Sequence, residues 1–173
     1  GDDLINFGAD LTALDVVDGG AGTDTLALNG DYSLAVSFGP TGLNSIENIR
    51  VAAGFRYDLI FDENSIAFGD SLTINGTTQG VADTLYIDAR NDTDGAVFAR
   101  GGAGIDYLHG GSGLSNELFG GGGDDFIDAT AGYNRIDGGD GDDQIVIYNS
   151  DGASHIRAGA GNDQLDLQGT MLI

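Results

Sequence analysis

The stretch GGAGIDYL, from Gly101 to Leu108, places one aspartate after a run rich in glycine and ends on an aliphatic residue. It returns with small changes as GGGGDDFI at 120–127, GGDGDDQI at 138–145 and AGAGNDQL at 158–165. More degenerate units lie between these copies, so that loop heads begin at residues 101, 110, 120, 129, 138, 149 and 158. The unit is a nonapeptide with occasional insertions, and a fixed period is typical of repeat architectures.

The eighth position of each unit is aliphatic, which predicts a short strand that turns one side chain into a core. The first six positions predict a turn, because glycines there can take positive φ without a Cβ clash. A flexible glycine linker would have no reason to keep an aliphatic residue in every unit. Strands this short are not stable alone, so we expect the units to stack. The aliphatic positions are Leu108, Leu118, Ile127, Ile136, Ile145, Ile156 and Leu165.

Two nonapeptides, each a turn plus a strand, would form one coil of an all-β parallel roll. Loops two units apart then lie on the same edge, which sorts the loops into two columns. One column carries aspartate at the sixth position, and the other carries Asn116, Asn134 and Ser154. One edge therefore keeps its carboxylates and the other lacks them. The sixth-position aspartates of the first column are Asp106, Asp125, Asp143 and Asp163.

We expect three segments, a repeat block at 1–27, a spacer at 28–100 and a second repeat block at 101–173. The first block shows the same alternation, with Asp3 and Asp24 at equivalent positions. The spacer has β-rich runs bounded by Gly, Asn and Asp, which we interpret as longer coils of the same stack. A separate small β-sandwich is the alternative. The opening residues GDDLIN resemble the end of a repeat, so we expect a piece of a longer protein.

The composition is strongly acidic, with a net charge of −22 and 28 acidic residues, of which only Glu47, Glu63 and Glu117 are glutamates. Such a charge repels nucleic acid and anionic membranes, and it opposes compaction unless cations neutralise it. The chain has no cysteine, which excludes disulfides, thiol nucleophiles and zinc–thiolate sites. No apolar run approaches the ~20 residues of a membrane span.

An aspartate set among converging backbone carbonyls forms a hard oxygen site, which suits Ca²⁺ with its 6 to 8 oxygen ligands. Magnesium demands a tighter octahedron, and softer metals prefer His or Cys. A solvated acidic face or a pair of catalytic carboxylates would not place each aspartate at a fixed offset after glycines. We therefore predict calcium ligation by Asp125, Asp143 and Asp163, and also by Asp106, Asp3 and Asp24.

The units GGAGTDTLA, GGAGIDYLH, GGGGDDFID, GGDGDDQIV and AGAGNDQLD resemble the RTX, or haemolysin-type, calcium-binding repeats. The resemblance implies a right-handed parallel β-roll that holds Ca²⁺ between loops two units apart. It also implies export of the unfolded chain through a type I channel, with folding triggered by extracellular calcium. The spacer resembles coils between such arrays in large bacterial surface and secreted proteins. We therefore expect a secreted or cell-surface module of a surface-layer protein, adhesin or toxin.

The family pattern assigns ligands to each position. The earlier loop of a pair gives carbonyls from positions one, three and five, and the later loop gives carbonyls from two and four plus the sixth-position carboxylate. About three ions follow for the second block, with one or two more elsewhere, and calcium is expected mainly along one edge. The implied ligand sets are Gly101, Ala103, Ile105, Gly121, Gly123 and Asp125; Gly120, Gly122, Asp124, Gly139, Gly141 and Asp143; and Gly138, Asp140, Asp142, Gly159, Gly161 and Asp163.

No nucleophile–base–acid set, phosphate loop or zinc-protease helix is present, so we expect no catalysis by this chain. His109 and His155 are predicted to be outward surface residues. Tyr107 and Phe126 are predicted to face outward and stack from coil to coil, an aromatic patch for a sugar being the alternative.

The alternative function is carbohydrate-directed, either binding of polyuronate or calcium-dependent processing of polysaccharide. Four arginines in or beside the spacer coils, Arg50, Arg56, Arg90 and Arg100, keep this hypothesis open. The expected partners are calcium ions, cell-surface polysaccharide, and other copies or the rest of a parent chain. The latter would contact the open ends of the roll, including the apolar residues 171–173. No nucleic-acid partner is expected.

Overall fold

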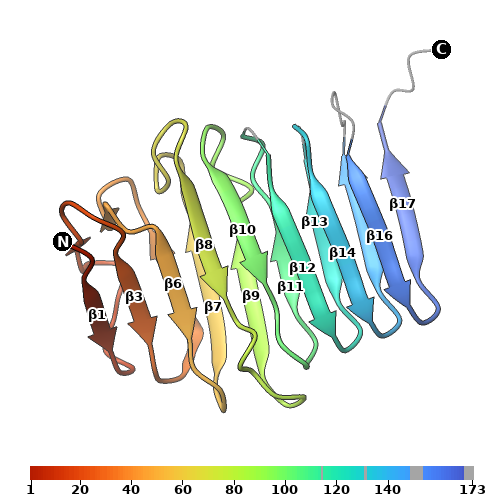
Figure 1. Ribbon diagram of the computed structural model, residues 1–173, viewed down its shortest axis with the longest axis horizontal. Coiled ribbons are helices and arrows are strands. Elements are labelled where there is room, and N and C mark those ends of the chain that lie inside the picture. The colour runs from red at the N-terminus through yellow and green to blue at the C-terminus, as the bar shows by residue number, and fades with distance from the viewer. Residues whose placement is uncertain (114, 131, 149–153, 170–173) are drawn as a thin grey trace.

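The computed structural model describes residues 1–113, 115–130, 132–148 and 154–169, and within these residues it contains β-strands and no helix (Figure 1). Two parallel sheets face each other, and we call them the front sheet and the back sheet. The front sheet contains, in spatial order, β1 (Leu4–Phe7), β3 (Thr25–Leu28), β6 (Asn48–Val51), β8 (Ser71–Asn75), β10 (Ala96–Arg100), β12 (Glu117–Gly122), β14 (Arg135–Asp140) and β16 (His155–Ala160). The back sheet contains β4 (Tyr32–Phe38), β7 (Arg56–Phe61), β9 (Thr84–Asp88), β11 (Tyr107–His109), β13 (Phe126–Ala129), β15 (Gln144–Tyr148) and β17 (Gln164–Gln168).

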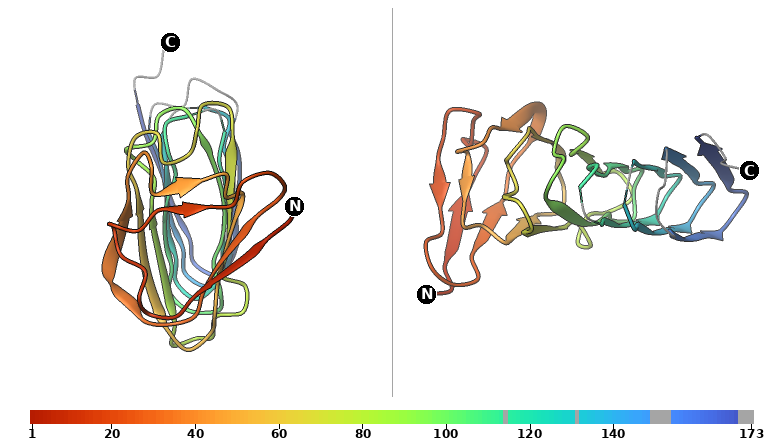
Figure 2. Two further views of the ribbon diagram at one scale, coloured as in Figure 1. Left: turned by 90° about the vertical axis from the view of Figure 1, so that its left-hand side faces the viewer. Right: turned by 90° about the horizontal axis from the view of Figure 1, so that it is seen from above.

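The chain alternates between the two sheets and so winds into a β-solenoid whose coils stack along one axis (Figure 2). Loops that lead from a front strand to the next back strand form the lower edge of Figure 1. Loops that return from a back strand to a front strand form its upper edge. A short third sheet pairs β2 (Val17–Asp18) with β5 (Leu43–Asn44) in the connections that lead to β3 and β6.

The aliphatic residues at the eighth position fill the space between the sheets. On the back sheet, strand pairing aligns Leu108 with Ile127 and Ile127 with Ile145, and all three are fully buried. Each such side chain contributes about 1.5–3 kcal/mol on burial. Leu165 continues this line but is 48% exposed, because β17 is the last described strand and no described coil covers it. The stack is thus held in register by one aliphatic column on each sheet.

The coils of the spacer are wider and use aromatic rings to fill the added space. Tyr32 stacks on Tyr57 with ring centroids 5.7 Å apart, and Phe38 stacks on Phe61 at 5.2 Å. The hydroxyl of Tyr57 donates a hydrogen bond of 3.1 Å to the carbonyl of Leu28, so its one polar group is satisfied inside the core.

The structure confirms the predicted all-β fold of stacked parallel coils. Strands from residues 28–100 pair with repeat strands in both sheets, which argues against a separate sandwich. The front strands are longer than the short strands expected, since β12 and β14 continue into the first loop positions. The loop at 149–153 and the terminal residues 171–173 lie outside the described residues. Within the described part, no helix has the length and apolar character needed to cross a membrane.

Candidate metal centres

The glycine loops of the lower edge stack so closely that their backbones touch. Gly139 and Gly141 both have positive φ, 116° and 136°. A Cβ atom on Gly139 would overlap the carbonyl oxygen of Gly121 in the previous coil, and one on Gly141 would overlap that of Gly123. Only glycine allows this approach at either position, which explains its recurrence at the second and fourth positions of the repeat.

The sixth-position aspartates form a ladder along the lower edge. The amide of Asp106 donates to Oδ1 of Asp125 at 2.8 Å, and the amide of Asp125 donates to Oδ1 of Asp143 at 2.9 Å. The amide of Asp143 donates to Oδ1 of Asp163 at 3.1 Å. One oxygen of each carboxylate therefore accepts the backbone N–H of the coil before it, and this fixes the orientation of the side chain.

The second oxygen separates these aspartates into two kinds. Oδ2 of Asp125 and Oδ2 of Asp143 are buried and have no hydrogen-bond partner among the described residues. In contrast, Oδ2 of Asp106 accepts the amide of Gly102 at 2.7 Å, and Oδ1 accepts that of Leu85 at 2.8 Å. A buried carboxylate oxygen without a donor is costly, and a cation beside it would offset that cost. The donor set of Asp125 and Asp143 thus fits a hard cation, whereas Asp106 is already satisfied by the protein.

The pKa values of the ladder aspartates differ in the same direction, since the pKa of Asp125 is higher than that of Asp106. Burial raises the pKa of Asp125 to about 8, and the nearby carboxylates of Asp106, Asp143 and Asp124 raise it further against the amide of Asp106, which lowers it. Burial raises the pKa of Asp106 to about 6 and also raises that of Asp143. Without a cation, the side chain of Asp125 therefore holds a proton at neutral pH.

The upper edge shows how the same position is satisfied without a cation. Asn116 Oδ1 accepts the amide of Val97 at 3.2 Å, which repeats the ladder bond of the aspartates. Asn116 Nδ2 donates to the carbonyl of Gly111 at 2.9 Å and to Oδ1 of Asn134 at 3.0 Å. An aspartate at this position would have a second anionic oxygen that needs a cation. The side chain of Asn116 has an NH₂ group there instead, which is the positive end of its dipole. The side chain of Asn116 therefore needs no cation beside it, and the expectation of calcium mainly along one edge stays a prediction.

The structure places Asp3 and Asp24 on the upper edge, opposite the aspartate ladder of the second block. The amide of Asp3 donates to Oδ1 of Asp24 at 2.7 Å, and the amide of Asp24 donates to Oε2 of Glu47 at 2.7 Å. Asp24 is fully buried and its Oδ2 has no partner among the described residues. Asp24 therefore matches Asp125, and the carboxylate ladder changes edge between the two blocks.

Glu47 was missed by the sequence analysis. It lies in the segment SIENI, which has no glycine turn, so only the stacking of coils shows that it occupies the position of a ladder carboxylate.

The remaining predicted ligands lie together in the lower-edge loops at 101–106, 120–125, 138–143 and 158–163. The described residues contain no group of three or more His, Cys, Asp or Glu side chains that could hold a metal. An ion there would be held mainly by backbone carbonyls with one carboxylate. The side chains of Asp124 and Asp142 form a second, exposed ladder, because their Oδ1 atoms accept the amides of Asp142 and Asn162 at 2.9 and 2.8 Å.

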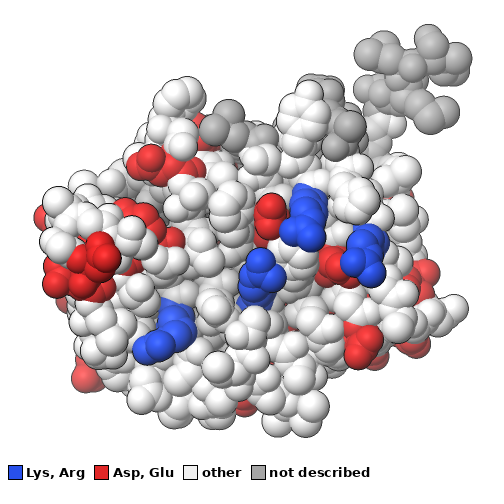
Figure 3. All heavy atoms as spheres, in the orientation of Figure 1, with Lys and Arg blue, Asp and Glu red and all other residues white. Residues whose placement is uncertain are grey.

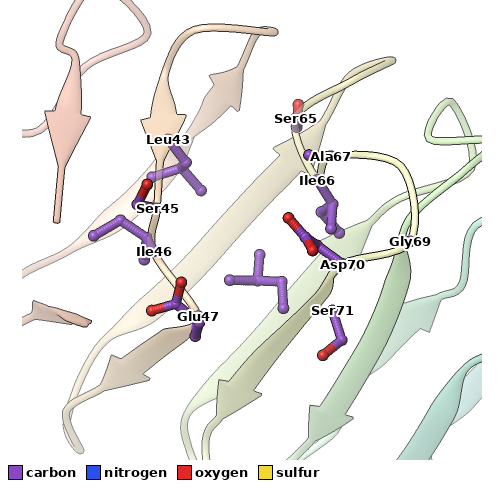
Figure 4. Close-up of a pocket in the computed structure, with 11 residues that line it drawn as sticks. Leu43, Ser45, Ile46, Glu47, Ser65, Ile66, Ala67, Gly69, Asp70 and Ser71 are labelled. Atoms are coloured by element: carbon purple, nitrogen blue, oxygen red, sulfur yellow. The ribbon is translucent and has the colours of Figure 1, made fainter. Parts of the chain in front are cut away.

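A cavity of about 290 Å³ lies on the upper edge, between the loops that precede β6 and β8 (Figure 4). Glu47 and Asp70 line it together with the apolar side chains of Ile46 and Ile66. It meets the upper ladder only through Glu47 and contains no predicted ligand. It is therefore separate from the aspartate ladder of the lower edge and borders the upper ladder at Glu47.

The expectation that His109 is a surface residue is wrong, since only 6% of it is exposed. The rings of Tyr86 and Phe126 flank it with centroids 5.3 and 5.5 Å away, and its Nδ1 lies 2.9 Å from Oδ2 of Asp128 without hydrogen-bond alignment. His155 is exposed, as expected. Tyr107 stacks between Tyr86 and Phe126 at 6.1 and 6.5 Å, which confirms stacking from coil to coil.

A family model described as the RTX calcium-binding nonapeptide repeat matches the chain in four segments, residues 14–32, 91–113, 119–146 and 148–169. The segments cover just over half of the chain and include every sixth-position aspartate from Asp24 onward. No curated protein and no solved structure matches the chain. The matched segments carry the stacked glycine turns and the carboxylate ladders, and so the chain belongs to the RTX calcium-binding nonapeptide repeat family, whose repeats are structural modules.

Proposed function

We propose that this chain is a non-catalytic module that folds when it binds calcium outside the cell, as part of a secreted or surface-exposed bacterial protein. The observation that carries the proposal is the pair of buried Oδ2 atoms on Asp125 and Asp143, for which the described residues supply no donor. A Cβ atom on Gly120 would meet Asp125 Oδ2 and the carbonyl oxygen of Gly138, and one on Gly138 would meet Asp143 Oδ2 and the carbonyl oxygen of Ala158. Carboxylate and carbonyl oxygens are the ligands that Ca²⁺ prefers.

Three ions are proposed for the lower edge, between the loop pairs that end in Asp125, Asp143 and Asp163. A further ion is proposed beside Asp24 on the upper edge, with Glu47 as the neighbouring carboxylate. The stacked amides orient each side chain before the ion binds, which lowers the entropy lost on binding. Asp106 and Asp3 would act as ladder residues at the start of each site series.

Calcium binding is proposed to drive folding, because the folded chain must bring its carboxylates together. The net charge of −22 opposes this compaction, and each bound ion removes two negative charges. Binding free energy then becomes folding free energy. Extracellular calcium modules bind at ~10⁻⁴ to 10⁻³ M, so the chain would stay unfolded in the cytosol and fold outside. The absence of cysteine suits export of an unfolded chain through a type I channel.

The parent protein is proposed to be a surface-layer component, adhesin or toxin in which this chain is a structural segment. The support for a structural role is that the buried carboxylates of Asp106 and Asp125, whose pKa values burial raises, belong to the ladder that links successive coils.

A circular-dichroism titration tests the proposal. Starting from chelator, added Ca²⁺ should produce a cooperative rise in β-structure, and Mg²⁺ at equal concentration should not. Asp143→Asn keeps the ladder acceptor but removes the anionic oxygen, so it should move the midpoint to higher calcium. Asp10→Asn removes the same charge from an exposed loop residue and should leave the midpoint unchanged. Full β-structure in chelator, or equal shifts in both variants, would contradict the proposal.

A further inference from the structure

The outer face of the front sheet carries two straight lines of side chains that point away from the core. Strand pairing puts these residues in register across β6 to β16, where they alternate with buried residues such as Ile49, Ile74 and Leu118. The first line is Arg50, Asn75, Arg100, Phe119, Asp137 and Arg157, and the second is Asn48, Thr73, Phe98, Glu117, Arg135 and His155.

The charge of this face is opposite to that of the chain as a whole. Four of the six arginines lie on these two lines, against two carboxylates, in a chain of net charge −22. Figure 3 shows arginine side chains across the middle of the face, while acidic side chains gather toward its left end and its margins. A local field of this sign would attract an anionic partner that the rest of the surface repels.

The arginines of the front face are also less neutralised than Arg56, in β7 of the back sheet, and Arg90, in the turn after β9. Arg56 and Arg90 each make two hydrogen bonds to one carboxylate, Asp58 at 3.0 and 3.2 Å and Asp88 at 2.9 and 2.6 Å. On the front face, Arg135 and Arg157 make single contacts of 3.3 and 3.4 Å with exposed or half-buried carboxylates.

Two arginines of the front face have no carboxylate partner. Arg50 and Arg100 form no ion pair within the described part of the chain. The guanidinium of Arg100 lies 4.6 Å from the ring centre of Phe119. These two guanidinium groups therefore keep donors available for a ligand.

We infer that this face binds a linear carboxylated polysaccharide that runs along the solenoid axis. The planar guanidinium group matches a carboxylate with two parallel hydrogen bonds. Asn48, Thr73 and Asn75 add neutral donors and acceptors of the kind that bind sugar hydroxyls. Phe98 adds a half-buried ring that can pack against the apolar side of a sugar. The ring of Phe119 already has the guanidinium groups of Arg100 and Arg135 over it, at 4.6 and 4.8 Å from its centre. The inference concerns the sheet face between the two loop edges and does not depend on the calcium sites.

The spacing of the arginines favours a polysaccharide over nucleic acid. Neighbouring strands lie ~4.8 Å apart, so Arg50 and Arg100, two strands apart, are separated by roughly 10 Å along the axis. A polymer with one carboxylate on each sugar has one negative charge per sugar ring, which is a wider spacing than that of the phosphates along a DNA duplex. Duplex DNA presents one charge per ~1.7 Å and would meet strong repulsion from the acidic edges.

Binding of short galacturonate oligomers to the full chain, folded in calcium, tests the inference. Neutral maltose-based oligomers of equal length and a DNA duplex serve as comparison ligands, with affinities measured by calorimetry. Arg50→Gln with Arg100→Gln should weaken galacturonate binding about tenfold or more, because both lost groups would pair with carboxylates. Arg56→Gln with Arg90→Gln removes the same charge from the back sheet and should change affinity less than about twofold.

Circular dichroism and the calcium midpoint establish that each variant is folded. If the double variant on the front face does not fold, Arg50→Lys replaces one exposed side chain, keeps its charge and should still weaken binding, because lysine lacks the planar fork. Wild-type binding no tighter than that of the neutral oligomer would overturn the inference. Equal losses in the two double variants would also overturn it, as would tighter binding of DNA than of galacturonate.

Discussion

Replacing Asp125 with asparagine should stabilise the chain without calcium, and calcium should cancel most of that gain. The asparagine keeps the Oδ1 acceptor for the amide of Asp106. It replaces the unpartnered Oδ2 with an NH₂ group, as Asn116 already does toward the carbonyl of Gly111. The variant thus converts one rung of the aspartate ladder into the kind found on the upper edge.

The magnitude follows from the pKa of Asp125, which burial raises to about 8. An ordinary aspartate has a pKa of ~3.9, so folding without a cation at neutral pH requires Asp125 to take up a proton, which costs about 4 kcal/mol. Asparagine avoids that cost, and we expect up to about 4 kcal/mol of added stability in chelator. In calcium at about 100 times its Kd, loss of one site removes about 3 kcal/mol, so the added stability should fall to about 1 kcal/mol.

Urea unfolding followed by circular dichroism measures both effects, once in chelator and once in calcium. An osmolyte added equally to both proteins brings the wild type into a measurable range if it is unfolded in chelator. The exposed variant Asp10→Asn should show no such dependence on calcium. Destabilisation of Asp125→Asn by similar amounts in both solutions would refute the reasoning, because the lost group would then act as an ordinary structural contact.

Three further outcomes are expected. In chelator, wild-type stability should fall as pH rises from about 4 to about 8, because folded Asp106 (pKa about 6) and Asp125 (pKa about 8) hold protons that the unfolded chain releases above a pKa of ~3.9; a urea midpoint independent of pH would contradict this. Gly139→Ala should destabilise far more than Gly54→Ala in thermal unfolding, since both have positive φ but only Gly139 has a carbonyl against the added Cβ; equal losses would exclude the stacking argument. Leu167→Lys should reduce self-association in sedimentation, because Leu167 is 67% exposed on the unpaired edge of β17; an unchanged sedimentation profile would remove β17 as the contact.

The nonapeptide period was enough to predict the coils of the second block, because one aliphatic residue and one turn recur in each unit. Ile127 and Ile136 are buried where that pattern places them, and Asp125 and Asp143 lie in one column. These features depend on local spacing, which a sequence displays directly.

The edge on which Asp24 lies could not be predicted, because residues 28–100 form coils of irregular length and the repeat register cannot be carried across them. The different roles of Asp106 and Asp125 could also not be predicted from the sequence. Both occupy the sixth position, yet only Asp106 finds the amide of Gly102 for its second oxygen. Such a difference depends on loop conformation.

The arginine lines and the burial of His109 depend on contacts between coils. Arg50 and Arg100 are fifty residues apart and share a line only through the pairing of β6, β8 and β10. His109 is covered because the rings of Tyr86 and Phe126 come from the coils on either side. No single unit of the repeat contains this information.

Diffraction from crystals grown in calcium, with anomalous scattering recorded at long wavelength, measures the central claim most directly. We predict anomalous peaks beside the carboxylates of Asp125, Asp143 and Asp163 on the lower edge and beside Asp24 on the upper edge. No peak should appear between the loops that carry Asn116 and Asn134. Absence of metal at Asp125 and Asp143, or peaks on the asparagine loops instead, would contradict the account.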